Sequence, residues 1–77
     1  MMTSEQDFRA IRWLTPEGEP VSCEEKLKVL AQNLAELRQS AQDALEDALL
    51  MGCAETQIRT VLRDLVDGLD NPYAQEH

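Results

Sequence analysis

Apolar residues recur with a seven-residue period over more than three consecutive heptads of the chain. Two interleaved series, spaced alternately three and four residues apart, make up this pattern. Its members, which we name the ladder, are Leu27, Leu30, Leu34, Leu37, Ala41, Ala44, Ala48 and Met51. Such spacing gathers side chains on one face of an α-helix and is typical of helices that pack at shallow angles. The ladder therefore predicts a long helix that buries one face against other helices.

Local signals place the ends of this helix. Ser22, followed three residues later by Glu25, has the spacing of a capping box at a helix N-terminus. Residues 23–51 contain no Gly and no Pro, and Gly52 then supplies the left-handed residue with which many helices end. We predict one helix over residues 23–51.

A second amphipathic segment follows after a short turn. Its apolar residues recur at helical intervals: Ile58, Val61, Leu62, Leu65, Val66 and Leu69. We predict a helix over residues 55–69, which ends before Pro72 because proline cannot continue it. With so short a connection, the two helices are expected to form an antiparallel helical hairpin over residues 22–70.

The segment 8–21 is predicted to form a β-arm or small hairpin. Its first seven residues are rich in strand formers. Pro16 and Gly18 occupy the second and fourth positions expected for a type I turn, and a short return strand follows. Residues 1–7 and 71–77 are expected to be disordered.

A short helix is the alternative for the start of this segment. Ser4 can cap a helix with Asp7 three residues on, and that helix would bring Phe8, Ile11 and Leu14 to one side. In either case the apolar side chains need the helices, because an isolated two-stranded hairpin is marginally stable.

The second predicted helix is about half as long as the first and cannot cover the whole ladder. Burying one leucine contributes about 1.5–3 kcal/mol, so the uncovered leucines require a cover. The candidates are the N-terminal arm, a second copy of the chain, and a different partner. The predicted interface residues are Leu27, Leu30, Leu34, Leu37 and Trp13. We predict a mainly all-α fold, a helical hairpin that assembles into a dimeric bundle.

The charge of the chain is strongly acidic. The net charge is −8 over 77 residues, and residues 41–77 carry eight acids against two arginines, which gives −6. Such a surface repels nucleic acid and anionic lipid and suits solubility or a basic partner. No apolar run approaches the ~18–20 residues that span a bilayer, and no signal-peptide pattern is present. We expect a small soluble cytoplasmic protein without a membrane partner.

Catalysis finds little support in the sequence. The only histidine is His77, the last residue. No Gly-rich phosphate loop, Ser/His/Asp set or Glu-x-x-His pair is present, and the carboxylates of the long helix point away from the ladder. We expect no enzymatic activity, no cofactor and no metal site.

The two cysteines, Cys23 and Cys53, lie at opposite ends of the long predicted helix. A straight helix of that length separates them by roughly 40 Å, far beyond the ~7 Å limit for a disulfide. A redox role would therefore require a disulfide between two chains. The alternative is that both cysteines are small, semi-buried residues without a redox role.

The Ala, Gly and aliphatic spacing in Ala48–Val61 resembles that of a helix-turn-helix unit, a motif of about 20 residues. The resemblance implies DNA contacts from the second helix: Thr56, Gln57, Arg59, Thr60 and Arg63. Ser40 with Asp43 could cap a separate helix and complete a trihelical unit. The charge of −6 in this half opposes contact with phosphates.

The acidic surface also suggests mimicry of nucleic acid, because Glu36, Asp43 and Asp47 are regularly spaced along the helix. Arg38 and Gln39 interrupt this surface. The main prediction is a small non-catalytic protein–protein interaction or regulatory module that forms a homodimer through the Leu27–Leu37 face. The alternatives are a DNA-binding regulator and an acidic inhibitor of a basic partner.

Overall fold

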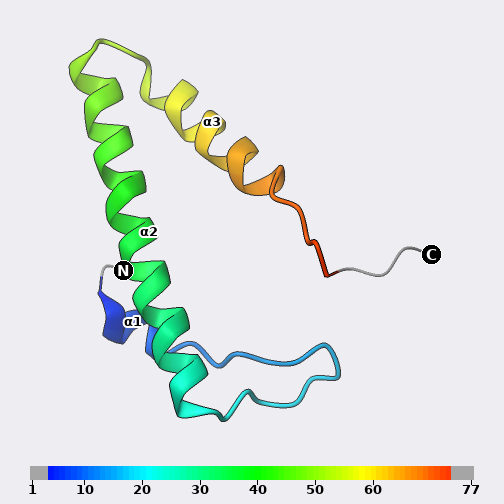
Figure 1. Cartoon of the computed structure of the whole chain (residues 1–77). Helices are drawn as coiled ribbons and strands as arrows, with labels where there is room; N and C mark the ends of the chain where they lie inside the picture. The colour runs from blue at the N-terminus through cyan, green and yellow to red at the C-terminus, as the bar shows by residue number, and fades with distance from the viewer. Residues whose placement is uncertain (1–3, 74–77) are drawn as a thin grey trace. The chain divides into compact units, whose positions relative to one another are not determined.

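The computed structural model describes residues 4–73. It contains three helices in this part of the chain: α1 (Glu5–Arg9), α2 (Glu24–Leu50) and α3 (Glu55–Asp67) (Figure 1). Between residues 4 and 73 the only β pairing is an isolated antiparallel bridge that joins Leu14 and Pro20. The prediction of a mainly helical fold is confirmed. None of the helices in the described part is long and apolar enough to cross a membrane.

The chain divides into two compact units, Met1–Gln42 (unit 1) and Asp43–His77 (unit 2). Unit 1 holds α1, the following loop and the N-terminal part of α2, whereas unit 2 holds the end of α2 and α3. The predicted disordered termini fall partly outside the described residues, at residues 1–3 and 74–77, and His77 lies outside them too.

A reciprocal cap begins α1. The Ser4 hydroxyl accepts a hydrogen bond from the Asp7 amide at 3.4 Å, and the Asp7 carboxylate accepts one from the Ser4 amide at 3.1 Å. This capping box satisfies two helix-end donors locally. Phe8 and Arg9, which the β-arm prediction placed in a strand, are therefore helical, because the cap outweighs a weak and context-dependent strand propensity.

The loop after α1 folds into a narrow turn. The Gly18 amide donates to the Thr15 carbonyl at 2.9 Å, and Gly18 has φ +85°, a region that glycine enters without a Cβ penalty. The Val21 amide donates to the Trp13 carbonyl at 2.9 Å. Pro20 has no amide hydrogen to extend the pairing, so the two sides share one bridge instead of forming strands.

The end of α2 has the hydrogen bonds of a Schellman motif. Gly52 has φ +90°, the Cys53 amide donates to the Ala48 carbonyl at 2.9 Å, and the Gly52 amide donates to the Leu49 carbonyl at 3.1 Å. The helix thus ends where Gly52 indicates. It runs without a break through Ser40, so no separate helix starts there.

In unit 2, α3 reverses direction after the turn at residues 51–54 (Figure 1). It begins at Glu55 without a side-chain cap on Ala54 and ends at Asp67, followed by Gly68 as the C-cap. The prediction extended this helix to Leu69. It ends earlier because Gly68 has low helix propensity, and the Gly68 amide closes the last turn on the Asp64 carbonyl at 2.9 Å.

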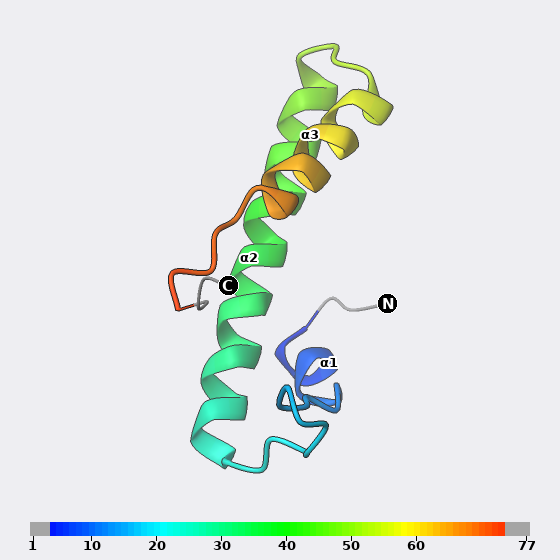
Figure 2. The same cartoon turned by 90° about the vertical axis from the view of Figure 1, so that its right-hand side faces the viewer.

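The buried core is very small. Among the described residues only Phe8 and Ala31 are buried, and both belong to unit 1. Two views agree that α1 lies beside the N-terminal half of α2 (Figures 1 and 2). Unit 2 contains no buried residue in its described part.

Candidate interaction surfaces

One side of α2 in unit 1 is covered by the N-terminal segment. Leu27, Ala31 and Leu34 are four and three residues apart, so they share one line along the helix. Ala31 is 1% exposed, and the two leucines are half-buried. Phe8 is buried in α1, which lies beside this part of α2 (Figure 2). We name this line the arm side of α2.

The other side of α2 in unit 1 is open. Leu30 is half-buried, whereas Val29 and Leu37 are 51% and 57% exposed. An open groove of about 470 Å³ runs along this side and is lined by Glu25, Lys26, Val29, Leu30 and Asn33. We name the groove together with Leu37 the open side of α2. The predicted interface is thus divided between the two sides.

The predicted interface residues have different environments. Leu27, Leu30, Leu34 and Trp13 are half-buried, and Leu37 is exposed. Trp13 belongs to the loop after α1, so its indole lies in the segment that covers α2, within unit 1. The sequence allows three candidates to cover these leucines: the N-terminal arm, a second copy and a different partner. The N-terminal arm covers the arm side only.

A second apolar surface lies on α3, where the helical hairpin prediction implied a covered helix face. Ile58 and Leu62 are half-buried, and no residue of α3 is buried. The other apolar positions are more than half exposed: Val61 51%, Leu65 56% and Val66 58% on α3, and Leu69 69% just after its last residue. A groove of about 370 Å³ on this helix is lined by Leu62, Arg63, Val66 and Asp67. We name these exposed residues and their groove the α3 face.

Sequence reasoning missed the α3 face because it assigned the apolar spacing of α3 wholly to contact with α2. The stripe from Ile58 to Leu69 extends over three turns. Only its first part, at Ile58 and Leu62, gains cover. The exposed face could have been predicted by comparing two lengths: that of the apolar stripe and that which a short hairpin contact can cover.

The residues of the helix-turn-helix alternative are all exposed on α3. Two local contacts engage them: the Arg59 guanidinium lies 2.8 Å from the Glu55 carboxylate, and the Thr60 hydroxyl donates to the Thr56 carbonyl at 2.9 Å. Gln57 and Arg63 complete the set. Because α2 continues through Ser40, the separate first helix of a trihelical unit is not formed.

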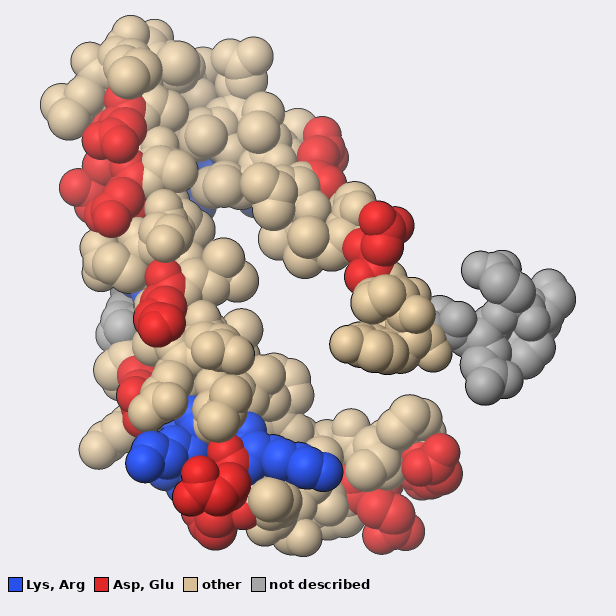
Figure 3. Space-filling view, in the orientation of Figure 1, with Lys and Arg blue, Asp and Glu red and all other residues tan. Residues whose placement is uncertain are grey.

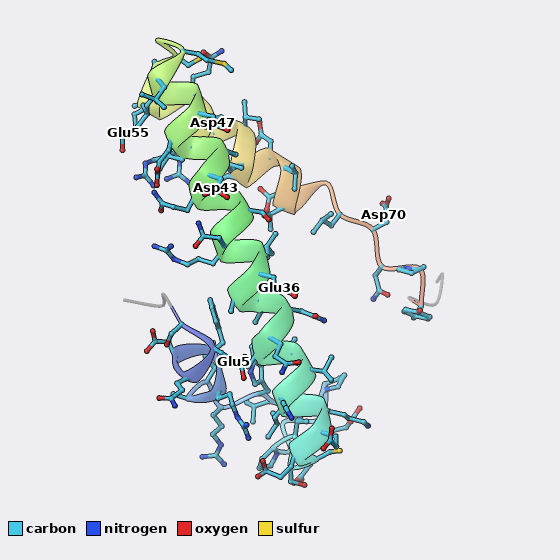
Figure 4. All side chains as sticks on the ribbon, turned by 60° about the vertical axis from the view of Figure 1, so that its left-hand side comes forward. Glu5, Glu36, Asp43, Asp47, Glu55 and Asp70 are labelled. Carbon is cyan, nitrogen blue, oxygen red and sulfur yellow. The ribbon has the colours of Figure 1, made fainter. Side chains whose placement is uncertain are left out.

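Charged side chains are unevenly distributed. Lys and Arg side chains gather over the first turns of α2, in unit 1 (Figure 3). Glu36, Asp43 and Asp47 follow one another along α2, and all three are exposed (Figure 4). They are the carboxylates that the mimicry alternative invokes.

Cys23 and Cys53 are exposed and form no disulfide. Cys23 directly precedes α2, and Cys53 lies in the turn between α2 and α3. Within residues 4–73 no group of three His, Cys, Asp or Glu side chains is placed to hold a metal ion.

Comparison with known proteins adds no assignment to these surfaces. No protein-family model, no curated protein and no solved structure matches the chain. The function is therefore inferred from the residues and geometry of the protein itself.

Proposed function

We propose that the protein is a small, non-catalytic helical module that binds another protein chain through apolar helix faces. Its first partner is a second copy, and the assembly is a dimeric helical bundle. The observation that carries the proposal is the exposure of the α3 face. Leu65 and Val66 on α3, and Leu69 two residues past its end, are each more than half exposed although the apolar spacing of this segment suits packing against another helix.

The free energy available from this face is large for so small a protein. Full burial of one such side chain contributes about 1.5–3 kcal/mol, so covering three side chains that are 56–69% exposed contributes about 3–5 kcal/mol per chain. The total stability of a small domain is about 5–15 kcal/mol. Contiguous exposed apolar residues of this kind mark interaction sites in soluble proteins. The exposed Val29 and Leu37 add a second apolar surface in unit 1.

In this proposal the N-terminal segment is a cover and not the interface. The predicted β-arm is retained as the narrow turn between Trp13 and Val21, whose role is to keep Phe8 and the loop against the arm side of α2. The interface in unit 1 is then the remaining part of the Leu27–Leu37 face, namely Leu30 and Leu37 together with Val29.

Two alternatives have weaker support. Exposure of Arg59 and Arg63 favours DNA binding, but the surrounding charge of −6 over residues 41–77 repels phosphate. The exposed carboxylates along α2 favour an acidic surface for a basic partner. Both alternatives leave the apolar α3 face without a role, whereas self-association uses it.

The experiment is a single charge introduced on the α3 face. Leu65→Asp should convert a dimer into a monomer with retained helicity, because an interface would bury an unpaired carboxylate. Gln57→Asp is the matched control: it adds the same charge to the same helix at an exposed polar position. Molecular mass by light scattering and helicity by circular dichroism are measured for both. Equal masses for the two variants and the wild type would refute self-association through α3.

A further inference from the structure

We propose that the α3 face of one copy docks on the open side of α2 in a second copy, and that the second copy reciprocates. This inference rests on the proposed self-association and names the two surfaces that meet. The alternative pairings are like with like, either two α3 faces or two open sides.

The two surfaces have a similar character. Exposed apolar side chains extend from Val29 to Leu37 on the open side and from Val61 to Leu69 on the α3 face. The first stretch covers eight residue steps, about 12 Å of helix. In the second stretch the helical part, Val61 to Asp67, covers six steps, about 9 Å, and Leu69 follows just after the helix. Each surface also carries a groove lined by a valine and a leucine, with one acid and one base beside them. An apolar helix stripe laid into a groove of this kind is a common mode of helix recognition.

Charge distinguishes unlike from like pairing for the α3 face. Two α3 faces in contact would gather two copies of the aspartates at 64, 67 and 70, from a half of the chain that carries −6. The open side has Lys26 beside Glu25 in its groove, and unit 1, with five bases against seven acids, carries a net charge of only −2. When α3 of one copy docks on this side, Lys26 of the other copy can pair with Asp67, and Glu25 of the other copy can pair with Arg63. Complementary charges at the edge of an apolar contact favour one partner over another.

Reciprocal docking also closes the assembly. A contact between two different surfaces produces an open chain of copies unless a symmetry axis closes it. When two copies exchange α3 faces around a two-fold axis, each surface is used once in each copy. The product is a dimer with two identical contacts.

The test is complementation between two single variants, Val29→Asp and Val66→Asp. Each replaces a valine that lines one of the two grooves and is more than half exposed, so neither disturbs a buried residue. Alone, each variant breaks both contacts of its own dimer and should dissociate at least about 100-fold more readily than the wild type. Mixed in equal amounts, they retain one intact contact, because the α3 face of the Val29→Asp chain meets the open side of the Val66→Asp chain.

Native mass spectrometry separates the outcomes, since the two variants differ in mass, and circular dichroism verifies that each is helical. Monomers from each variant alone and a mixed dimer from the mixture are expected. If either variant alone stays dimeric, or if the mixture yields no mixed dimer while the wild type is dimeric, reciprocal docking is wrong and the proposed function stands. A monomeric wild type would overturn both.

A charge pair gives a second readout that does not depend on apolar packing. Lys26→Glu should weaken the dimer about 2- to 5-fold, as expected for an exposed ion pair. Mixing this variant with Asp67→Lys should restore the affinity. An Asp67→Lys chain that weakens the mixture further would show that the two residues do not meet.

Discussion

The Arg9 guanidinium lies 2.7 Å from the carboxylate of Glu24, and this ion pair joins α1 to the first turn of α2. The two side chains are 39% and 81% exposed, so water screens the attraction. Exposed ion pairs of this type contribute about 0.2–1 kcal/mol. The pair therefore directs the N-terminal segment but contributes little to holding it.

The first prediction follows from this exposure. Arg9→Ala should lower the free energy of unfolding by no more than about 1 kcal/mol, and the difference from wild type should shrink in high salt. Urea unfolding at one fixed protein concentration measures it. Arg12→Ala, a neighbouring exposed arginine, is the control. A loss above about 2 kcal/mol would show that the ion pair, and not apolar burial, attaches α1.

Phe8 should be the main anchor of the N-terminal segment. Phe8→Ala removes one of the two buried side chains of the described structure and should cost about 3 kcal/mol or more of unfolding free energy. Tyr73→Ala removes an aromatic ring that is 89% exposed and should change stability by less than about 0.5 kcal/mol. Similar losses from the two variants would contradict the assignment of the core to unit 1.

Gly52 should be required for its backbone conformation alone. Its φ is +90°, and a Cβ added at this position would meet nothing within 4 Å, so Gly52→Ala introduces backbone strain without a clash. We expect a loss of about 1–2 kcal/mol, and a smaller loss for Gly52→Asn, since asparagine tolerates the left-handed region. Urea unfolding compares the three proteins. An alanine variant as stable as the wild type would show that the turn reorganises.

The DNA-binding alternative has a direct test. We expect no shift of duplex DNA at about 20 mM salt, where phosphate contacts are least screened, because the half of the chain that carries Arg59 and Arg63 has a net charge of −6. A shift that the double variant Arg59→Ala, Arg63→Ala abolishes would revive the helix-turn-helix function.

The parts of the fold that local signals encode could be predicted. The Ser22–Glu25 spacing and Gly52 locate the ends of α2 within one residue, because a capping pattern and a left-handed C-terminal residue are local properties. The Ser4–Asp7 cap is also visible in the sequence, but the strand formers after Phe8 compete with it and favour a β-arm, of which the structure forms a single bridge. A cap makes hydrogen bonds within four residues, whereas strand formers need a partner strand, and Pro20 denies them one.

The division of surfaces could not be predicted in the same way. The ladder shows that Leu27 and Leu37 share a face, but which of them is covered depends on where Phe8 and the loop pack. That packing joins residues far apart in sequence. The exposure of Leu65 and Val66 is equally non-local, since the spacing of α3 is the same whether a helix covers it or not.

Self-association is tested most directly by sedimentation equilibrium of the unmodified protein. The chain has a mass of 8.7 kDa, and we expect a concentration-dependent rise to twice that value, with no larger species. The dimer should persist in moderate salt, because apolar burial and not charge provides its stability. A mass of 8.7 kDa at every concentration would contradict the account, since the α3 face would then stay uncovered by a second copy.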